Sequence, residues 1–123
     1  LLLERADHPG YWQSVTGSLN WDEQPAVAAR RELLEETGIV AEPLDCQRLN
    51  RFPILPAWRA RYHPDVAENV EHVFALELPM RCEIRLSSEH TRYEWLDATT
   101  AAARCFSWTN AEAIEKIVVT HRI

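Results

Sequence analysis

The clearest hydrophobic pattern in the chain runs from Pro25 to Thr37, where apolar residues recur at helical spacing. At roughly 100° per residue, Val27 and Leu34 fall on one side of a helix. Ala26 and Leu33 widen that side. The opposite side carries carboxylates at positions i, i+3 and i+4, which are Glu32, Glu35 and Glu36. The pattern predicts an amphipathic helix that buries its apolar stripe and holds a dense negative edge outward.

The rest of the chain alternates short apolar runs with two further helical patterns. Asp97 is a residue type suited to cap a helix over 98–104, and Thr109 to Glu112 has the sequence of a capping box before a helix from about Asn110 to Val119. Strands are expected at 1–5, 11–16, 39–40, 44–49, 71–78 and 93–96. These elements predict an α/β fold in which a mixed β-sheet is sandwiched between helices, with the helix at 25–37 on one face and the last helix on the other.

Two segments modify this picture. Phe52 to Pro56 contains two prolines, which remove ladder donors and exclude a central strand. We therefore expect an apolar loop there, either folded over the core or forming a wall of a substrate site. Leu1 to Arg5 has the pattern of the end of a buried strand, so we also expect an N-terminal strand that precedes it and is missing from this sequence.

Length and composition are those of one ordinary globular domain spanning residues 1–123, with 46% hydrophobic and 26% charged residues. A net charge of −6 argues against a general nucleic-acid binder, because no basic stripe is available to neutralise phosphates. No apolar run approaches about 18 residues, so a membrane span is not expected. The three cysteines form no close pair, which favours reduced thiols in a cytoplasmic protein.

The three clustered glutamates are the first candidate for chemistry. Like charges at this helical spacing repel one another by a few tenths of a kcal/mol per pair. Without basic partners, such an edge is either a solvated surface or a site for a hard divalent cation, which prefers carboxylate oxygens. The spacing alone leaves both interpretations open.

The residues around the cluster favour a built site. Gly17 permits a tight turn or a close backbone approach. Pro25 suits the first turn of the helix, and Gly38 suits the left-handed conformation just past its end. Glu23 and Arg31 are interpreted as an ion pair that fixes the preceding loop on the helix. Glu32, Glu35 and Glu36 then remain for metal binding.

The stretch from Gly17 through Glu23 to the run Arg31–Ile39 resembles the conserved box of the Nudix hydrolases, with every fixed position filled. The resemblance implies the Nudix fold and a loop–helix–loop that binds Mg2+, with Mn2+ as a possible substitute. It also implies cleavage of a diphosphate linked to another group.

Further segments resemble the branch of this family that converts dihydroneopterin triphosphate to the monophosphate and pyrophosphate in folate biosynthesis. These segments are 12–18, 44–48, 61–62, 88–90, 93–97 and 106–110. By that resemblance Glu32, Glu36 and Glu89 are metal ligands, and Glu35 binds a further ion. Either Glu32 or Glu89 is the implied general base. The implied substrate-binding residues are Arg5, Thr16, Phe52, Pro53, Ile54, Leu55 and Ser107.

Two alternatives remain open at this point. A broader Nudix hydrolase would cleave deoxynucleoside triphosphates or dinucleotide polyphosphates, since the box does not specify the attached group. A binding module without turnover is the second alternative, and the intact carboxylates count against it. The expected partner is a small-molecule triphosphate substrate, with no nucleic acid and no membrane, and the oligomeric state stays open.

Overall fold

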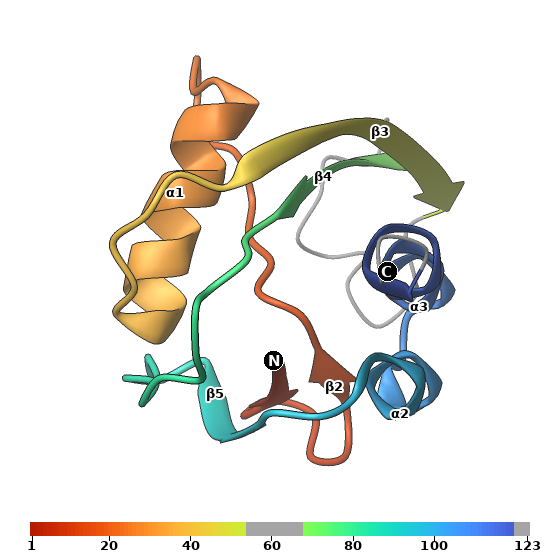
Figure 1. The fold of residues 1–123 in the computed structure, drawn as a ribbon. Coiled ribbons are helices and arrows are strands. Elements are labelled where there is room, and N and C mark those ends of the chain that lie inside the picture. The colour runs from red at the N-terminus through yellow and green to blue at the C-terminus, as the bar shows by residue number, and fades with distance from the viewer. Residues whose placement is uncertain (54–67, 120–123) are drawn as a thin grey trace.

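The computed structural model describes residues 1–53 and 68–119. Figure 1 shows a mixture of strands and helices, which confirms the α/β class expected from the sequence. In chain order the elements are β1 (Leu2–Arg5), β2 (Trp12–Gln13), α1 (Pro25–Thr37), β3 (Leu44–Pro53), β4 (Glu68–Ala75), β5 (His90–Glu94), α2 (Ala98–Arg104), α3 (Trp108–Ala113) and the π-helix η2 (Ile114–Val119).

The strands form two sheets. The first has the order β2-β1-β5, and β1 pairs antiparallel with both neighbours. The second is the antiparallel pair of β3 and β4. An isolated parallel bridge joins Trp12 to Cys105, so the segment before α3 lies against β2. The first sheet carries His90 and Gln13 toward the helix that bears the glutamates.

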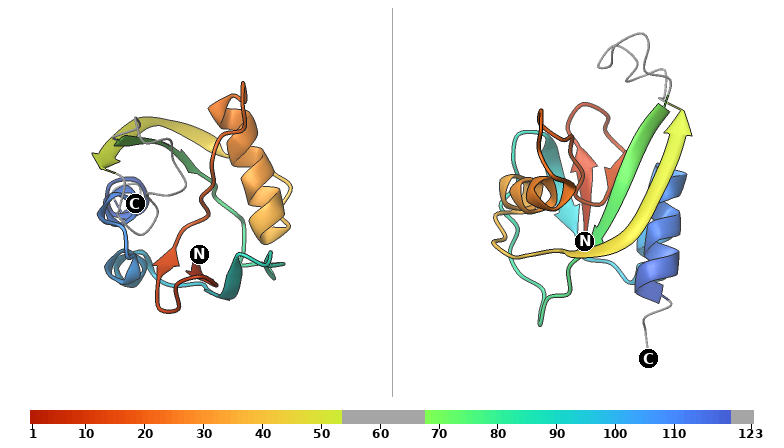
Figure 2. Two further views of the ribbon diagram at one scale, coloured as in Figure 1. Left: turned by 180° about the vertical axis from the view of Figure 1, so that it is seen from behind. Right: turned by 90° about the horizontal axis from the view of Figure 1, so that it is seen from above.

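The helices lie on opposite sides of the molecule. In Figures 1 and 2, α1 lies on one side and α2 and α3 on the other, with strands between them, as the sequence predicts. The buried cluster on the side of the last helices is built on Leu2, Trp12 and Ala101. Trp12 is 7% exposed, consistent with the large apolar area that an aromatic side chain contributes to a small core.

The ends of α1 are those expected from the sequence. Pro25 is the first helical residue, and Gly38 follows the helix with φ 78°. The N–H of Gly38 donates to the carbonyl of Leu34, which satisfies one of the last free carbonyls.

The face that α1 buries differs from the prediction. Val27 and Leu34 are 42% and 49% exposed, whereas Glu36 is only 3% exposed. The expectation that all three carboxylates face outward is therefore wrong for Glu36. The helix turns the side that carries Glu36 toward the protein and leaves Val27 and Leu34 partly in solvent. Burial of the Glu36 carboxylate is tolerated because two side chains from another segment hydrogen-bond to it. The buried positions of α1 are Ala28, Leu33, Glu36 and Thr37.

The C-terminal helices confirm one cap and correct another. Asp97 accepts a hydrogen bond from the N–H of Thr100 at the start of α2, as expected. The capping box is wrong, because α3 begins at Trp108 and Ser107 is its N-cap residue. The two side chains of the expected box have other partners: the hydroxyl of Thr109 contacts that of Ser107, and Glu112 pairs with Arg48 on β3. These contacts replace the local capping pattern.

Some strand bounds also shift. Ile39 and Val40 lie outside any strand, since the chain after Gly38 turns toward β3. β3 extends as far as Phe52 and Pro53, and only 54–56 of the expected loop fall outside the described residues. Among the helices that the structure describes, none has the length and apolar character needed to cross a membrane.

Candidate functional site

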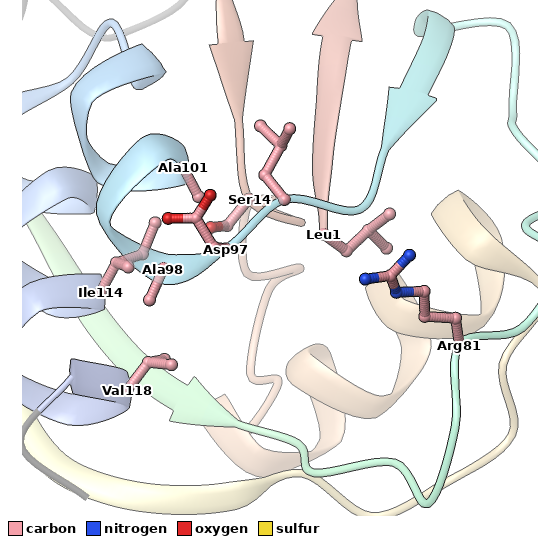
Figure 3. Close-up of a pocket in the computed structure, with 9 residues that line it drawn as sticks. Leu1, Ser14, Arg81, Asp97, Ala98, Ala101, Ile114 and Val118 are labelled. Carbon is pink, nitrogen blue, oxygen red and sulfur yellow. The ribbon is translucent and has the colours of Figure 1, made fainter. Parts of the chain in front are cut away.

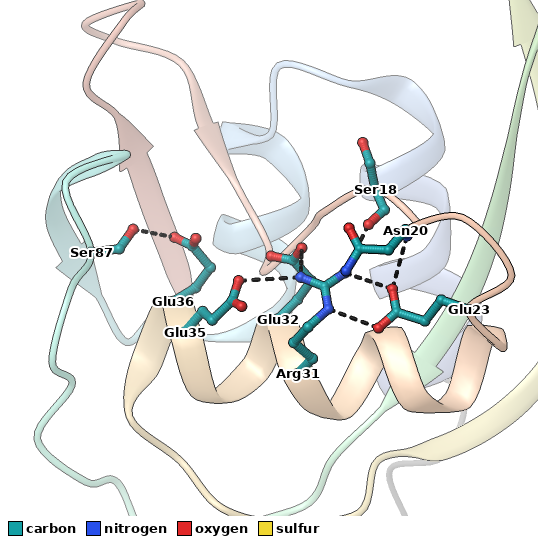
Figure 4. A network of polar contacts seen from close by, with 8 residues as sticks. All are labelled: Ser18, Asn20, Glu23, Arg31, Glu32, Glu35, Glu36 and Ser87. Carbon is teal, nitrogen blue, oxygen red and sulfur yellow. Dashed lines mark hydrogen bonds and ion pairs between the residues drawn. The ribbon is translucent and has the colours of Figure 1, made fainter.

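Three glutamates on one face of α1 form the centre of the candidate site (Figure 4). One carboxylate oxygen from each of Glu32, Glu35 and Glu36 lies within 4.8 Å of the others. Glu35 is exposed, Glu32 is half-buried and Glu36 is buried. Burial raises the pKa of the Glu32 carboxyl, and the adjacent Arg31 opposes that rise. These three carboxylates supply the oxygen ligands that a divalent cation prefers, and the exposed Glu35 leaves the site open to a cation from solvent.

Arg31 connects the glutamates to the loop before α1. Its Nε and one terminal nitrogen donate to the two oxygens of Glu23 at 2.8 Å each, so the predicted ion pair is confirmed (Figure 4). The guanidinium lowers the pKa of Glu23 to about 2. Glu23 Oε1 also accepts from the N–H of Asn20, which fastens the loop. Arg31 further donates to the carbonyl of Ser18 at 2.9 Å.

The same guanidinium also reaches the metal-ligand candidates. Arg31 donates to Glu32 Oε1 at 2.7 Å and to Glu35 Oε2 at 3.2 Å. The carboxylate edge therefore has a basic partner, contrary to one premise of the sequence argument. One guanidinium shared with Glu23 leaves the cluster with excess negative charge. The excess is what a cation site requires.

Gly17 is in contact with the side chain of Glu32. A Cβ placed on Gly17 would lie 2.1 Å from Glu32 Cδ and 2.4 Å from its Oε1. Such distances are far inside van der Waals contact. The close backbone approach expected at Gly17 is therefore an approach to a carboxylate of the cluster, and any side chain there would displace it.

Glu36 is held from outside its own helix. Ser87 Oγ donates to Glu36 Oε2 at 2.7 Å, and His90 Nδ1 lies 2.9 Å from the same oxygen. The side chains of His90 and Glu36 are 2% and 4% exposed. Sequence reasoning missed both partners. Their only sequence signal is position, since they flank Glu89 in a polar break before a strand.

Glu89 reaches the cluster although it lies 53 residues beyond Glu36 in the chain. Its backbone N–H donates to Ser87 Oγ, the hydroxyl that binds Glu36. Proximity to Glu36 is the main reason why the pKa of the Glu89 carboxyl is raised, and burial adds to it. The structure thus brings the fourth predicted ligand beside the box helix.

The predicted substrate residues are more dispersed. Arg5 ends β1 and forms a paired contact with Asp7, at 2.8 Å for each hydrogen bond. Thr16 is exposed and directly precedes Gly17, and Ser107 precedes α3, where its hydroxyl contacts Thr109. Phe52 and Pro53 end β3. Ile54 and Leu55 lie outside the described residues.

A cavity of about 380 Å³ lies between the β1–β2 region, α2 and η2 (Figure 3). None of the predicted site residues lines it. Its charged side chains are Arg81 and Asp97, and Asp97 is already engaged as the cap of α2. The carboxylate cluster is therefore the better candidate for chemistry. The lining consists of Leu1, Ser14, Arg81, Leu96, Asp97, Ala98, Ala101, Ile114 and Val118.

Comparison with known proteins gives the same family as the Nudix-like stretch from Gly17 to Ile39. The NUDIX domain family matches residues 1–117. The dihydroneopterin triphosphate diphosphatase of Escherichia coli K12 is 48% identical over 124 residues, covering 97% of this chain and 82% of that protein. The protein of that name from Haemophilus influenzae is 38% identical over 127 residues, covering 99% and 80%.

A solved structure agrees with these sequence relationships. The E. coli dihydroneopterin triphosphate pyrophosphohydrolase matches with a TM-score of 0.92 at 44% identity, covering 97% of this chain and 84% of that one. The expected Nudix fold is thereby confirmed. The chain belongs to the Nudix family.

Proposed function

We propose that this protein is a Mg2+-dependent pyrophosphohydrolase that converts dihydroneopterin triphosphate to dihydroneopterin monophosphate and pyrophosphate. The observation that carries the proposal is the extent of the similarity to dihydroneopterin triphosphate diphosphatases, which covers nearly the whole chain and not the box alone. The reaction belongs to folate biosynthesis, and the proposed compartment is the cytoplasm.

The metal would be held by Glu32, Glu35, Glu36 and Glu89. The geometry supports this set, because oxygens of the first three carboxylates lie within 4.8 Å of one another and the backbone N–H of Glu89 donates to Ser87, whose hydroxyl binds Glu36. Mg2+, with Mn2+ as a substitute, supplies neutralisation of phosphate charge and activation of water when bound. An acidic protein needs such a cation to accept a polyphosphate.

A carboxylate then accepts the proton of the attacking water. Glu32 and Glu89 are the proposed candidates, because both lie beside Glu36, where a metal-activated water would be held. The water oxygen forms a bond to phosphorus, and the bridging P–O bond breaks. Pyrophosphate leaves, and the organic monophosphate remains.

Recognition of the pterin is assigned to residues away from the cluster. A flat ring needs an apolar wall with a few polar groups at its edge. We assign the wall to Phe52, Pro53, Ile54 and Leu55. The polar contacts are assigned to Arg5, Thr16 and Ser107, of which Arg5 is linked to the cluster through Gln13 and His90.

The proposal is tested by pyrophosphate release from dihydroneopterin triphosphate with and without Mg2+. Glu36→Gln is expected to abolish release, because it removes one charged ligand. The matched control is Glu42→Gln, which alters an exposed glutamate paired with Arg30. Equal activity of the two variants, or release that persists in the presence of a chelator, would refute the metal assignment. A lack of release by the wild type on every triphosphate would favour a binding module without turnover.

A further inference from the structure

His90, the first residue of β5, lies between Glu36 on α1 and Gln13 on β2, with a buried polar partner on each ring nitrogen. Its Nδ1 lies 2.9 Å from Glu36 Oε2, and its Nε2 lies 3.0 Å from Gln13 Nε2. All three residues are at most 5% exposed. Each ring nitrogen thus has a protein partner, and these partners decide which nitrogen carries the hydrogen.

The direction of these hydrogen bonds follows from Arg5. Asp7 binds the guanidinium of Arg5 with both carboxylate oxygens, which fixes its orientation. A terminal nitrogen of Arg5 then donates to Gln13 Oε1 at 3.3 Å. Because a guanidinium has no acceptor, the atom of Gln13 that faces it must be the oxygen. The amide NH2 of Gln13 therefore faces His90.

Only one position of the ring hydrogen of His90 is compatible with this arrangement. Gln13 Nε2 donates, so His90 Nε2 must offer its lone pair. The ring hydrogen then lies on Nδ1, where it is donated to Glu36 Oε2. Ser87 donates to that same oxygen at 2.7 Å. Oε2 is thus occupied by protein donors, and Oε1 is the oxygen that a cation would take.

We propose that His90 is a positioning residue for Glu36, locked in the Nδ1–H form by the relay from Asp7 through Arg5 and Gln13. This inference rests on the proposed function, because it takes Glu36 as a metal ligand. The relay fixes one carboxylate oxygen and presents the other to the cation. Hydrogen-bond partners of metal-ligating carboxylates typically contribute about 10–100-fold to metal affinity or activity, which sets the expected size of the effect.

The first test reads the ring directly in the metal-free protein. Two-bond ¹H–¹⁵N correlation spectra of the histidine rings show which nitrogen carries hydrogen, and the signal missing from His90→Asn assigns His90. We expect Nδ1–H with a bare Nε2. Hydrogen on Nε2, on both nitrogens or averaged between them would overturn the proposal.

The second test measures Mn2+ binding without substrate, using the electron paramagnetic resonance signal of free Mn2+. His90→Leu removes the donor and is expected to raise the Kd for Mn2+ about 10–100-fold. His90→Asn places an amide N–H where Nδ1 stood and should stay within a few-fold of wild type. His72→Leu is the matched control, because His72 is exposed on β4.

The outcomes separate this inference from the proposed function. Equal affinity of wild type and His90→Leu, or a loss in His90→Asn as large as that in His90→Leu, would show that His90 only fills space. If His90→Leu fails to fold, the comparison of His90→Asn with wild type and the ring spectrum still decide. A wild type that binds no Mn2+ would contradict the proposed function as well, whereas a wrong ring form would contradict the role of His90 alone.

Discussion

Replacing Gly17 by alanine should disable the site without unfolding the protein. The new Cβ would lie 2.1 Å from Cδ and 2.4 Å from Cγ and Oε1 of Glu32. Restoring van der Waals contact requires the carboxylate to move by at least about 1 Å. Gly17 has no positive φ, so alanine adds no backbone strain there. The perturbation therefore acts on the position of Glu32.

A displacement of this size is expected to lower the catalytic rate. Misplacing a catalytic group by about 1 Å can reduce the rate by about 100-fold, or roughly 2.7 kcal/mol of transition-state stabilisation. We therefore expect kcat/KM of Gly17→Ala to fall by about 100-fold. The melting temperature should stay close to that of wild type, because the far end of a side chain can move more easily than backbone.

The assay is pyrophosphate release under saturating Mg2+, with the melting temperature measured in parallel. Gly10→Ala is the matched control: Gly10 has φ 90° and open space around it, so alanine costs about 1–2 kcal/mol of stability without touching the site. It should melt earlier but keep its kcat/KM. A Gly17→Ala variant with near-normal kcat/KM would refute the role of this contact, as would a loss explained entirely by unfolding.

Three further predictions concern stability. Glu36→Gln should melt in EDTA at or above the wild-type temperature, because it relieves repulsion and keeps an acceptor for its buried partners; a large drop would contradict this. Arg92 is the main reason why the pKa of Glu4 falls from 4.5 to about 2, so the stability advantage of wild type over Glu4→Gln should hold above pH 4.5 and disappear as pH falls toward 2, as measured by urea unfolding. An advantage independent of pH would exclude this ion pair as its source. Asp97→Ala should lower the unfolding free energy by about 1 kcal/mol through loss of the cap on Thr100, and an unchanged urea midpoint would show that the cap contributes nothing.

Features set by nearby residues could be predicted from the sequence. Pro25 and Gly38 mark the ends of α1, and Asp97 caps α2 as its position indicates. The ion pair between Glu23 and Arg31 also follows from local spacing, since the helix places Arg31 two turns above the loop. These contacts depend on chain geometry over a few residues.

Features that depend on distant segments could not be predicted. Spacing along α1 shows that Glu36 shares a face with the other glutamates, but it does not show which face meets the protein. The burial of Glu36 is decided by His90, 54 residues later in the chain. In the same way, the distant Arg48 pairs with Glu112, the glutamate that the expected capping box needs, and α3 begins at Trp108 instead.

The candidate site shows the same division. The cluster of Glu32, Glu35 and Glu36 follows from one helix, and the proximity of Glu89 was expected only through family resemblance. Gln13 gave no signal of its own and His90 only its position beside Glu89, because a single polar residue in a short strand has many ordinary roles. Their function becomes visible only when three separate strands and α1 are placed together.

The most direct test of the account is a competition experiment with the wild-type protein and Mg2+. Dihydroneopterin triphosphate and the four common deoxynucleoside triphosphates are supplied together at equal concentration, and their disappearance gives the ratios of kcat/KM. The account predicts that the pterin triphosphate is consumed first and yields its monophosphate and pyrophosphate. Faster consumption of any deoxynucleoside triphosphate would contradict the proposed substrate.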